Sequence, residues 1–203
     1  MSESAVGDLR RDEELAVWKW ALVAALVLVP VAARLVPYWF HFMPLTAVAI
    51  FSGAWFADWR LKLGIPLAAR VVSDLALGFQ MAQPSEVLFV YACLVVSVLL
   101  GWMVRRRRAT VLAPMVAGLT SAVVFFLVSN FGVWLASTPA LGPYYYPPTL
   151  AGLAKCYEMA WPFFRATLIS DVVYTGVLFA AYAWACQLSP KWAIVPGWQG
   201  NRQ

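Results

Sequence analysis

The sequence predicts an all-α integral membrane protein: a bundle of six transmembrane helices with an additional short interfacial helix before the last span. Of its 203 residues, 63% are hydrophobic and 12% are charged, whereas soluble domains have about 45–50% apolar and about 25% charged residues. The apolar residues also fall in long blocks separated by short polar connections. Lipid favours this pattern because a spanning helix satisfies its own backbone hydrogen bonds.

A single membrane domain is expected over residues 1–203, with residues 1–14 as a polar cytoplasmic N-terminal tail and residues 189–203 as a cytoplasmic C-terminal tail. The N-terminal tail does not resemble a signal peptide. Arg10 and Arg11 are followed by three acidic residues, and a short apolar run with a small-residue cleavage site is missing. The first span is therefore expected to remain in the mature protein.

The spans differ in character. The first is almost purely Ala, Val and Leu, the second is short for a bilayer, and the third contains Arg70, Ser73 and Asp74 within apolar sequence. The fourth stops at a run of arginines that begins at Arg105. In order, the six expected spans are residues 15–33, 44–57, 63–79, 87–104, 111–136 and 163–188.

The segment between the last two spans is expected to contain the interfacial helix. Residues 137–149 carry four prolines and three consecutive tyrosines, so they cannot be helical throughout. Residues 149–161 then favour a short helix with Thr149 as its N-cap and Pro162 marking its end. This piece is too short and too polar to span, so we expect it to lie at the membrane surface.

The distribution of Lys and Arg predicts the orientation. With the N-terminus inside, most basic residues of the connections and tails fall on the cytoplasmic side, and the outer side receives only Arg34, Lys155 and Arg165. Cytoplasmic loops carry such an excess in membrane proteins. Both termini are therefore expected to be cytoplasmic, in the cytoplasmic (inner) membrane of the cell.

Several function classes are disfavoured. The net charge of +5 is expected to set orientation rather than to recruit nucleic acid. The chain lacks the motifs of zinc peptidases, serine hydrolases and P-loop ATPases, and it has no dense Asp cluster. We therefore expect no catalytic residue, no metal and no cofactor. The three cysteines lie in different segments without zinc-site spacing; they are Cys93, Cys156 and Cys186.

Polar residues from distant parts of the chain fall at the outer side of this topology. An ionisable group at bilayer depth costs about 2.5–3.5 kcal/mol on insertion scales, so such groups usually face a cavity or one another. We therefore expect an outward-facing polar pocket in the outer half of the bundle. Its candidate ligand-binding residues are Arg34, Asp74, Asn130, Tyr157, Arg165 and Asp171.

A static interpretation of the same residues stays open. Arg70 and Asp74 are four residues apart, so they share a helical face and can neutralise each other. Arg165 and Asp171 can likewise pair with Asp74 or Arg34. The charges would then form a network that only holds the helices together.

Two further features suggest contacts with a ligand or a partner. Tyr144, Tyr145 and Tyr146 are candidates for a lid, because flat aromatic faces with a few polar anchors hold small ligands, although an interfacial aromatic belt accounts for them as well. Ala21 and Ala25 form a small-xxx-small pattern that lets a partner helix approach closely. In an Ala-rich span, this spacing also arises by chance.

Several blocks of the sequence are distinctive, among them Asn130-Phe-Gly-Val-Trp134 and the stretch from Pro162-Phe-Phe-Arg165 to Asp171. Together these blocks, which cover roughly residues 34–183, resemble a family of uncharacterised bacterial multi-pass membrane proteins regarded as transport proteins. More distantly, the size, the six spans and the outward pocket are similar to the S components of energy-coupling factor vitamin transporters. This resemblance implies uptake of a small molecule such as a vitamin or another micronutrient.

The same resemblance implies the partners. Besides the lipid bilayer and a small-molecule ligand, they are a transmembrane coupling subunit and ATPases, because the chain itself has no Walker motif. Proton-coupled transport through Asp74 or Asp171 is a variant, since carboxyl groups within the membrane can carry protons. A membrane-embedded enzyme and a non-transporting scaffold or assembly protein remain as alternatives.

Overall fold

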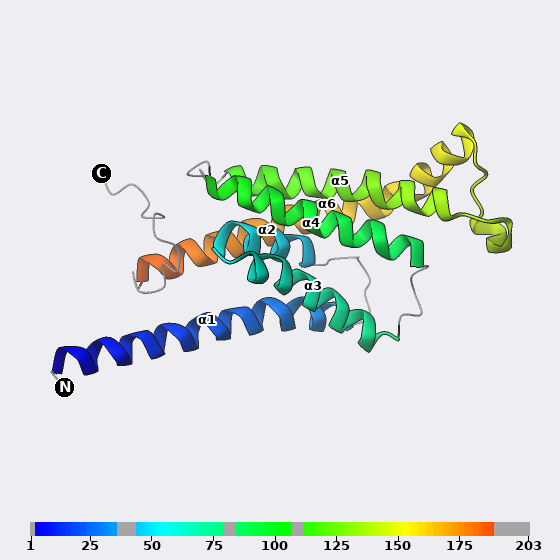
Figure 1. Ribbon diagram of the computed structural model, residues 1–203. Helices are drawn as coiled ribbons and strands as arrows, with labels where there is room; N and C mark the ends of the chain where they lie inside the picture. The colour runs from blue at the N-terminus through cyan, green and yellow to red at the C-terminus, as the bar shows by residue number, and fades with distance from the viewer. Residues whose placement is uncertain (1–2, 36–43, 79–83, 107–111, 189–203) are drawn as a thin grey trace.

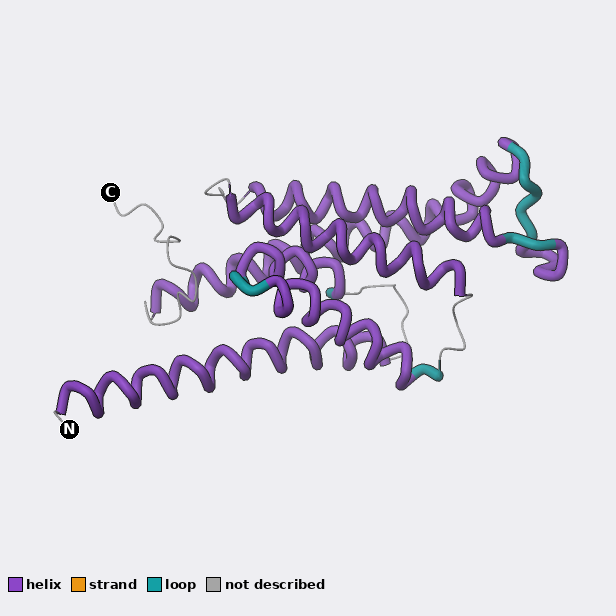
Figure 2. Tube along the Cα trace, viewed as in Figure 1, coloured by secondary structure: helices purple, strands orange, loops and turns teal. Residues whose placement is uncertain are grey.

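The structure is a computed structural model that describes residues 3–35, 44–78, 84–106 and 112–188. Within these residues it contains six α-helices, one 3-10 helix and no strand (Figures 1 and 2). The predicted C-terminal tail, residues 189–203, lies outside the described residues. The helices are α1 (Glu3–Leu35), α2 (Leu45–Trp55), α3 (Trp59–Ala76), α4 (Pro84–Arg106), α5 (Leu112–Ala136), η1 (Pro139–Tyr144) and α6 (Leu150–Leu188).

The helices lie side by side, and the chain reverses its direction from each α-helix to the next (Figure 1). As a result, α1 begins and α6 ends at the same end of the bundle, which we call the terminal end. The opposite end holds η1, and we call it the η1 end. The last turns of α1, α3 and α5 and the first turns of α4 and α6 therefore lie toward the η1 end.

Helix α1 is longer than the apolar run that predicts the first span, because the chain is helical from Glu3 onward. The segment apolar enough to cross a membrane begins at Val17, so the polar residues 3–14 precede it as helix. One predicted boundary is wrong. The predicted interfacial helix and last span form one continuous helix, α6, of 39 residues with Pro162 inside it. A proline removes one helical hydrogen bond, but packing against neighbouring helices lets membrane helices accept it. Here Phe164, two residues after Pro162, stacks on Phe126 of α5 with ring centroids 4.4 Å apart.

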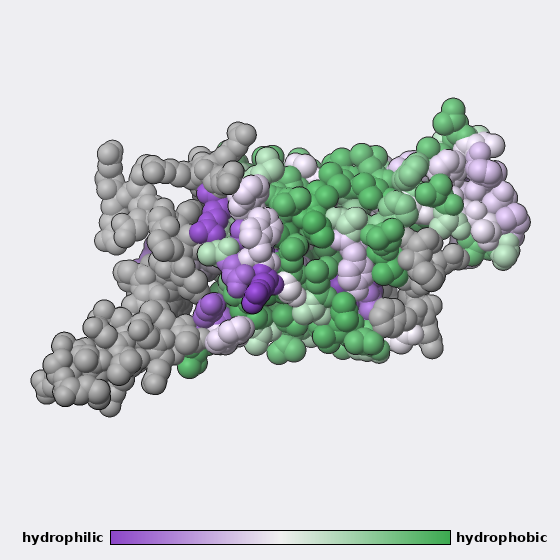
Figure 3. Space-filling model, viewed as in Figure 1, coloured by the Kyte–Doolittle hydropathy of each residue, from purple (hydrophilic) through white to green (hydrophobic). Residues whose placement is uncertain are grey.

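Among the described residues, four helical segments are long and apolar enough to cross a membrane. Only 17–33% of their most apolar windows is buried inside the protein, and Leu28, Leu88 and Val177 are more than half exposed. On the face that Figure 3 shows, hydrophobic residues form a belt between hydrophilic residues toward the left and paler residues at the right. Such a surface is favourable in lipid and unfavourable in water, so the chain is a multi-helix membrane protein. The segments are Val17–Leu35, Val87–Arg105, Leu112–Ala136 and Leu150–Ala185.

The other two α-helices, α2 and α3, are not complete candidates. The 11 residues of α2 extend about 16 Å at 1.5 Å per residue, roughly half of the hydrocarbon thickness of about 30 Å. The 18 residues of α3 carry several charged side chains. Four of the six predicted spans therefore have the length and composition of a transmembrane helix, and α2 and α3 do not.

α2 is the centre of the bundle, although it is the shortest α-helix. Its residues from Ala47 to Trp55 are all buried. Two glycines let α2 and α4 approach at backbone distance, because a Cβ atom on Gly53 would collide with the Val98 carbonyl group and one on Gly101 with the Ile50 carbonyl group. Small residues drive helix association in membranes by allowing such contact. The position of α2 is therefore fixed by its packing against α4.

Candidate ligand-binding site

The short length of α2 creates space inside the bundle toward the η1 end. A cavity of about 330 Å³ lies there and is lined by side chains from all six α-helices. Much of its wall is aromatic, with Phe125 and Phe126 from α5 and Phe163 and Phe164 from α6. Its polar lining residues are Arg34, Thr46, Arg70, Ser129, Asn130, Thr167 and Asp171. An apolar cavity with a few convergent polar groups is the usual form of a small-molecule site.

Two arginines on one wall of the cavity share a single carboxylate. Arg34, in the last turn of α1, places its Nη1 atom 2.5 Å from Oδ1 of Asp74. Arg70, one turn before Asp74 on α3, places its Nε atom 2.7 Å from Oδ2. All three side chains are at most 13% exposed. Within the described part of the chain, two positive charges therefore face one negative charge, and this cluster carries an excess of one positive charge.

Hydrogen bonds hold this cluster in place. Nη1 of Arg34 also donates to the Ser73 hydroxyl at 2.7 Å, and that hydroxyl donates to the Arg70 carbonyl oxygen at 2.9 Å. The Tyr91 hydroxyl of α4 lies 3.5 Å from Oδ2 of Asp74. The cluster thus connects the ends of α1 and α3 and reaches toward the start of α4, so the two guanidinium groups are fixed before any ligand arrives.

Asp171 lies on a different wall, in the middle of α6. Its side chain is 1% exposed and lines the cavity, and the Thr46 hydroxyl donates a hydrogen bond to it. Its Oδ2 atom is buried without a hydrogen-bond partner. Among the residues that the structure describes, no Lys or Arg forms an ion pair with Asp171. A buried polar atom without a partner is costly, and Asp171 is therefore the residue most in need of an additional donor.

The predicted pocket residues separate into three groups. Arg34, Asn130 and Asp171 line the cavity, and the Nδ2 group of Asn130 donates to the Phe126 carbonyl oxygen at 2.8 Å. Asp74 lies behind the wall, where it positions two arginines. Tyr157 and Arg165 do not line the cavity.

Tyr157 and Arg165 face away from the cavity for different reasons. The Tyr157 hydroxyl donates to the Leu127 carbonyl oxygen of α5 at 2.7 Å, so it ties the two helices together. Arg165 is exposed on the outer face of α6. The face of a helix that a residue occupies depends on packing, which the position of the residue along a span does not reveal.

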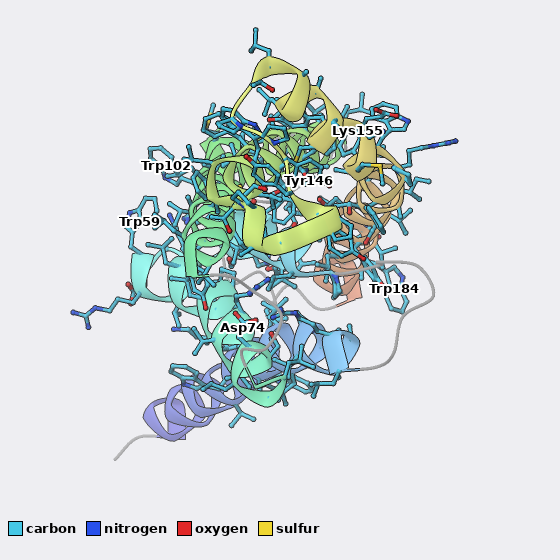
Figure 4. The ribbon with its side chains drawn as sticks, turned by 90° about the vertical axis from the view of Figure 1, so that its right-hand side faces the viewer. Trp59, Asp74, Trp102, Tyr146, Lys155 and Trp184 are labelled. Atoms are coloured by element: carbon cyan, nitrogen blue, oxygen red, sulfur yellow. The ribbon has the colours of Figure 1, made fainter. Side chains whose placement is uncertain are left out.

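The loop with the three predicted lid residues, Tyr144, Tyr145 and Tyr146, covers part of the η1 end but contributes no side chain to the cavity wall. Tyr144 is 75% exposed, and the Tyr146 N–H donates to the Ser137 hydroxyl at 2.7 Å. Burial raises the pKa of the Tyr146 phenol, so it stays neutral at physiological pH. Figure 4, which views the molecule from this end, shows Tyr146 beside η1 and Asp74 on α3, on opposite sides of the end face.

The start of α6 fixes the other end of this loop. The Gly152 N–H donates to the Thr149 hydroxyl at 3.1 Å, so the prediction that Thr149 is the N-cap is confirmed. The Trp134 indole N–H donates to the Pro147 carbonyl oxygen at 2.9 Å. A Cβ atom on Gly152 would collide with that same carbonyl group. The loop is therefore connected to α5 and α6 at several points.

The predicted partner-helix residues, Ala21 and Ala25, are both exposed on α1.

Some residues of the site are not predicted from the sequence. They are Thr46, Tyr91 and the four phenylalanines of the cavity wall, Phe125, Phe126, Phe163 and Phe164. The shortness of the second span is the one signal that points to Thr46, because a membrane helix of half length has an end inside the bundle.

The comparisons with known proteins identify a family. A family model described as "Family of unknown function (DUF6580)" matches residues 15–192. No curated protein and no solved structure matches the chain. Because the family match covers most of the sequence, the chain belongs to the DUF6580 family of unknown function.

Proposed function

We propose that this protein captures a small micronutrient, such as a vitamin, as the membrane-embedded binding component of an uptake system. The observation that carries the proposal is the cavity of about 330 Å³ with Arg34, Arg70 and Asp171 in its wall. Charged side chains inside a membrane are expensive, and three of them converge on one enclosed space. A ligand that uses these groups accounts for their presence.

A purely static network accounts less well for the same geometry. It would pair each charge with an opposite charge, whereas Asp74 is shared by two arginines and Asp171 has no basic partner in the described part of the chain. Within that part, Arg34 makes its polar contacts through Nη1 alone and Arg70 through Nε alone. A guanidinium group has five N–H donors, so several remain for a ligand.

In the proposed arrangement, the chain passes through the membrane six times, and the six passes correspond to the six α-helices. Helix α2 forms only part of the second pass because it is too short to cross the hydrocarbon layer alone. The η1 end faces outward from the cytoplasmic (inner) membrane. Both termini are then cytoplasmic, in agreement with the positive-inside distribution of Lys and Arg. The cavity opens toward the side from which nutrients arrive, and a transmembrane coupling subunit with ATPases would drive release.

The size of the cavity limits the ligand. Its volume of about 330 Å³ is at the lower end of the range of about 300–1,000 Å³ for small-molecule sites. A compound as large as cobalamin does not fit such a space. Among micronutrients, the cavity therefore supports a single-ring or two-ring compound.

A thermal-shift screen of the purified protein in detergent tests this function. The compounds are small vitamins, cobalamin precursors, nucleobases and transition metals. A ligand that binds only the folded state raises the apparent melting temperature with increasing concentration. We expect at least one small vitamin-like compound to do so, and we expect Arg70→Gln to reduce the shift.

The matched control is Lys155→Ala. Lys155 is exposed near the η1 end and pairs only with exposed Glu158 in the described residues. The Lys155→Ala substitution therefore removes a positive charge at the same end without changing a side chain that lines the cavity. If no compound shifts the folded protein, a scaffold or an enzyme becomes the better interpretation.

A further inference from the structure

We infer that the ligand is a small organic acid, an anion with a flat apolar body and an N–H or O–H donor opposite its acid group. The inference rests on the proposed function, because it specifies the substrate class of the same cavity. It depends on three separate observations: the excess positive charge of one wall, the unpartnered carboxyl oxygen of another, and the aromatic surface between them.

The first wall fits an acid group. Arg34 and Arg70 both face the cavity, and among the described residues the ion pairs of both arginines are with Asp74 alone. Arginine binds carboxylates through parallel N–H donors, and such charge-assisted bonds are about twice as strong as neutral ones. A ligand carboxylate at this wall would balance the extra charge. The same wall repels an organic cation.

The start of α2 adds to this preference. Leu45 and Thr46, its first two residues, line the cavity, and the helix has no side-chain hydrogen bond at its N-cap. The first N–H groups of a helix have no partner within the helix and carry the positive end of its dipole. A helix start alone is a weak signal, but here it lies in the same cavity as two arginines.

The second wall fits a donor. Asp171 is buried and lines the cavity, its hydrogen bond from the Thr46 hydroxyl satisfies one part of the carboxyl group, and its Oδ2 atom has no partner. A ligand N–H or O–H group at this position would remove the cost of that unsatisfied atom. A ligand with only an acid group would leave it unsatisfied.

The middle of the cavity fits a ring. Phe125, Phe126, Phe163 and Phe164 supply most of the large apolar side chains of its wall. Flat ligands gain from offset-stacked or edge-on contact with such side chains. The whole pattern therefore favours an aromatic or heteroaromatic acid with an amino or hydroxyl substituent on the far side of the ring.

The experiment uses the full-length protein and matched probes that differ by one group. 4-Aminobenzoate carries both the acid and the donor, 4-aminobenzamide lacks the negative charge, and 4-methylbenzoate lacks the donor. The panel extends this design to other single-ring and two-ring acids, each with its amide and its methyl analogue, and includes the corresponding amines without an acid group. Binding is measured by thermal shift and by calorimetry.

We expect acids with a donor to bind best, and we expect each matched amide and each methyl analogue to bind about tenfold or more weakly. Two variants assign these preferences to residues. Arg70→Gln should abolish the preference for acid over amide, while Arg34 still compensates Asp74 so that the protein folds. Asp171→Asn should abolish the preference for the donor-bearing acid over its methyl analogue. Substitution of a residue that only supports the fold would weaken the binding of all probes equally.

Three results would overturn the inference. One is binding confined to amines or uncharged compounds, and another is acid binding that is unchanged in Arg70→Gln. The third is a non-acidic ligand from the broad vitamin screen with no binding of any acid, which overturns the substrate class and leaves the capture function standing. If neither the acid panel nor the broad screen yields a ligand for the folded protein, both proposals fail.

Discussion

At the scale of single residues, Asp74 is the side chain on which the stability of the η1 end depends most. It is 7% exposed and contacts two arginines. We predict that Asp74→Asn destabilises the protein by about 3–5 kcal/mol, because removing one partner of a buried ion pair leaves its charge uncompensated. Arg70→Gln should cost clearly less, because Arg34 and Asp74 remain paired. Thermal and denaturant unfolding in detergent compare the two variants. Equal costs would contradict the shared-carboxylate geometry.

Substitution of Asp171 should have the opposite effect on the stability of the ligand-free protein. Its Oδ2 atom is buried without a partner, and the Thr46 hydroxyl donates to the same side chain. We predict that Asp171→Asn leaves the ligand-free protein as stable as before or stabilises it, since it removes a buried carboxyl group and keeps an acceptor for Thr46. The same change should weaken ligand binding. A melting temperature that falls by several degrees without ligand would show that Asp171 has a structural role instead.

At the scale of elements, the contact between α2 and α4 sets the position of the cavity. Gly53 and Gly101 lie where a Cβ atom would collide with the backbone of the facing helix. We predict that Gly53→Ala or Gly101→Ala destabilises the protein by about 1–3 kcal/mol, which is the usual cost of overpacking. Unfolding in detergent measures this cost.

Two other helical glycines provide the control. A Cβ atom on Gly64 or Gly176 would meet no atom within 4 Å, so alanine there should be neutral or slightly stabilising, because glycine lowers helix stability. If all four alanine variants lose the same stability, the loss comes from glycine removal in general and the close contact of α2 with α4 is not its cause.

Sequence patterns predict helices better than they predict helix ends. The apolar blocks identify every α-helix because lipid requires long apolar runs. They fail at Pro162, where contacts of α6 with α5 carry the helix through a proline that would end most helices in water.

The same distinction holds for the site. Depth follows from counting along a span, so Arg34, Asn130 and Asp171 could be placed in one layer of the bundle, and the structure brings all three to the cavity wall. Rotation about the helix axis does not follow from depth. Arg165 lies outside the cavity wall for that reason. Thr46 is part of the wall because α2 begins inside the bundle.

At the scale of the whole molecule, the alternating directions of the α-helices place the start of α1 and the end of α6 at one end (Figure 1). The terminal end also holds Arg60, Lys62 and Arg105, near the ends of α3 and α4. We predict that this end faces the cytoplasm, because basic residues near span ends are retained there. Full-length fusions at the C-terminus test this orientation: green fluorescent protein should fluoresce, and alkaline phosphatase should be inactive.

The η1 end gives the complementary measurement. Tyr144 is 75% exposed there, so a cysteine introduced as Tyr144→Cys should react with a membrane-impermeant maleimide added to intact cells. The background is a variant with all three native cysteines replaced by alanine. Labelling only after cell lysis, together with an active alkaline phosphatase fusion, would show that the protein has the opposite orientation. The cavity would then open toward the cytoplasm, where it cannot receive a nutrient from outside, so this result would also exclude capture for uptake.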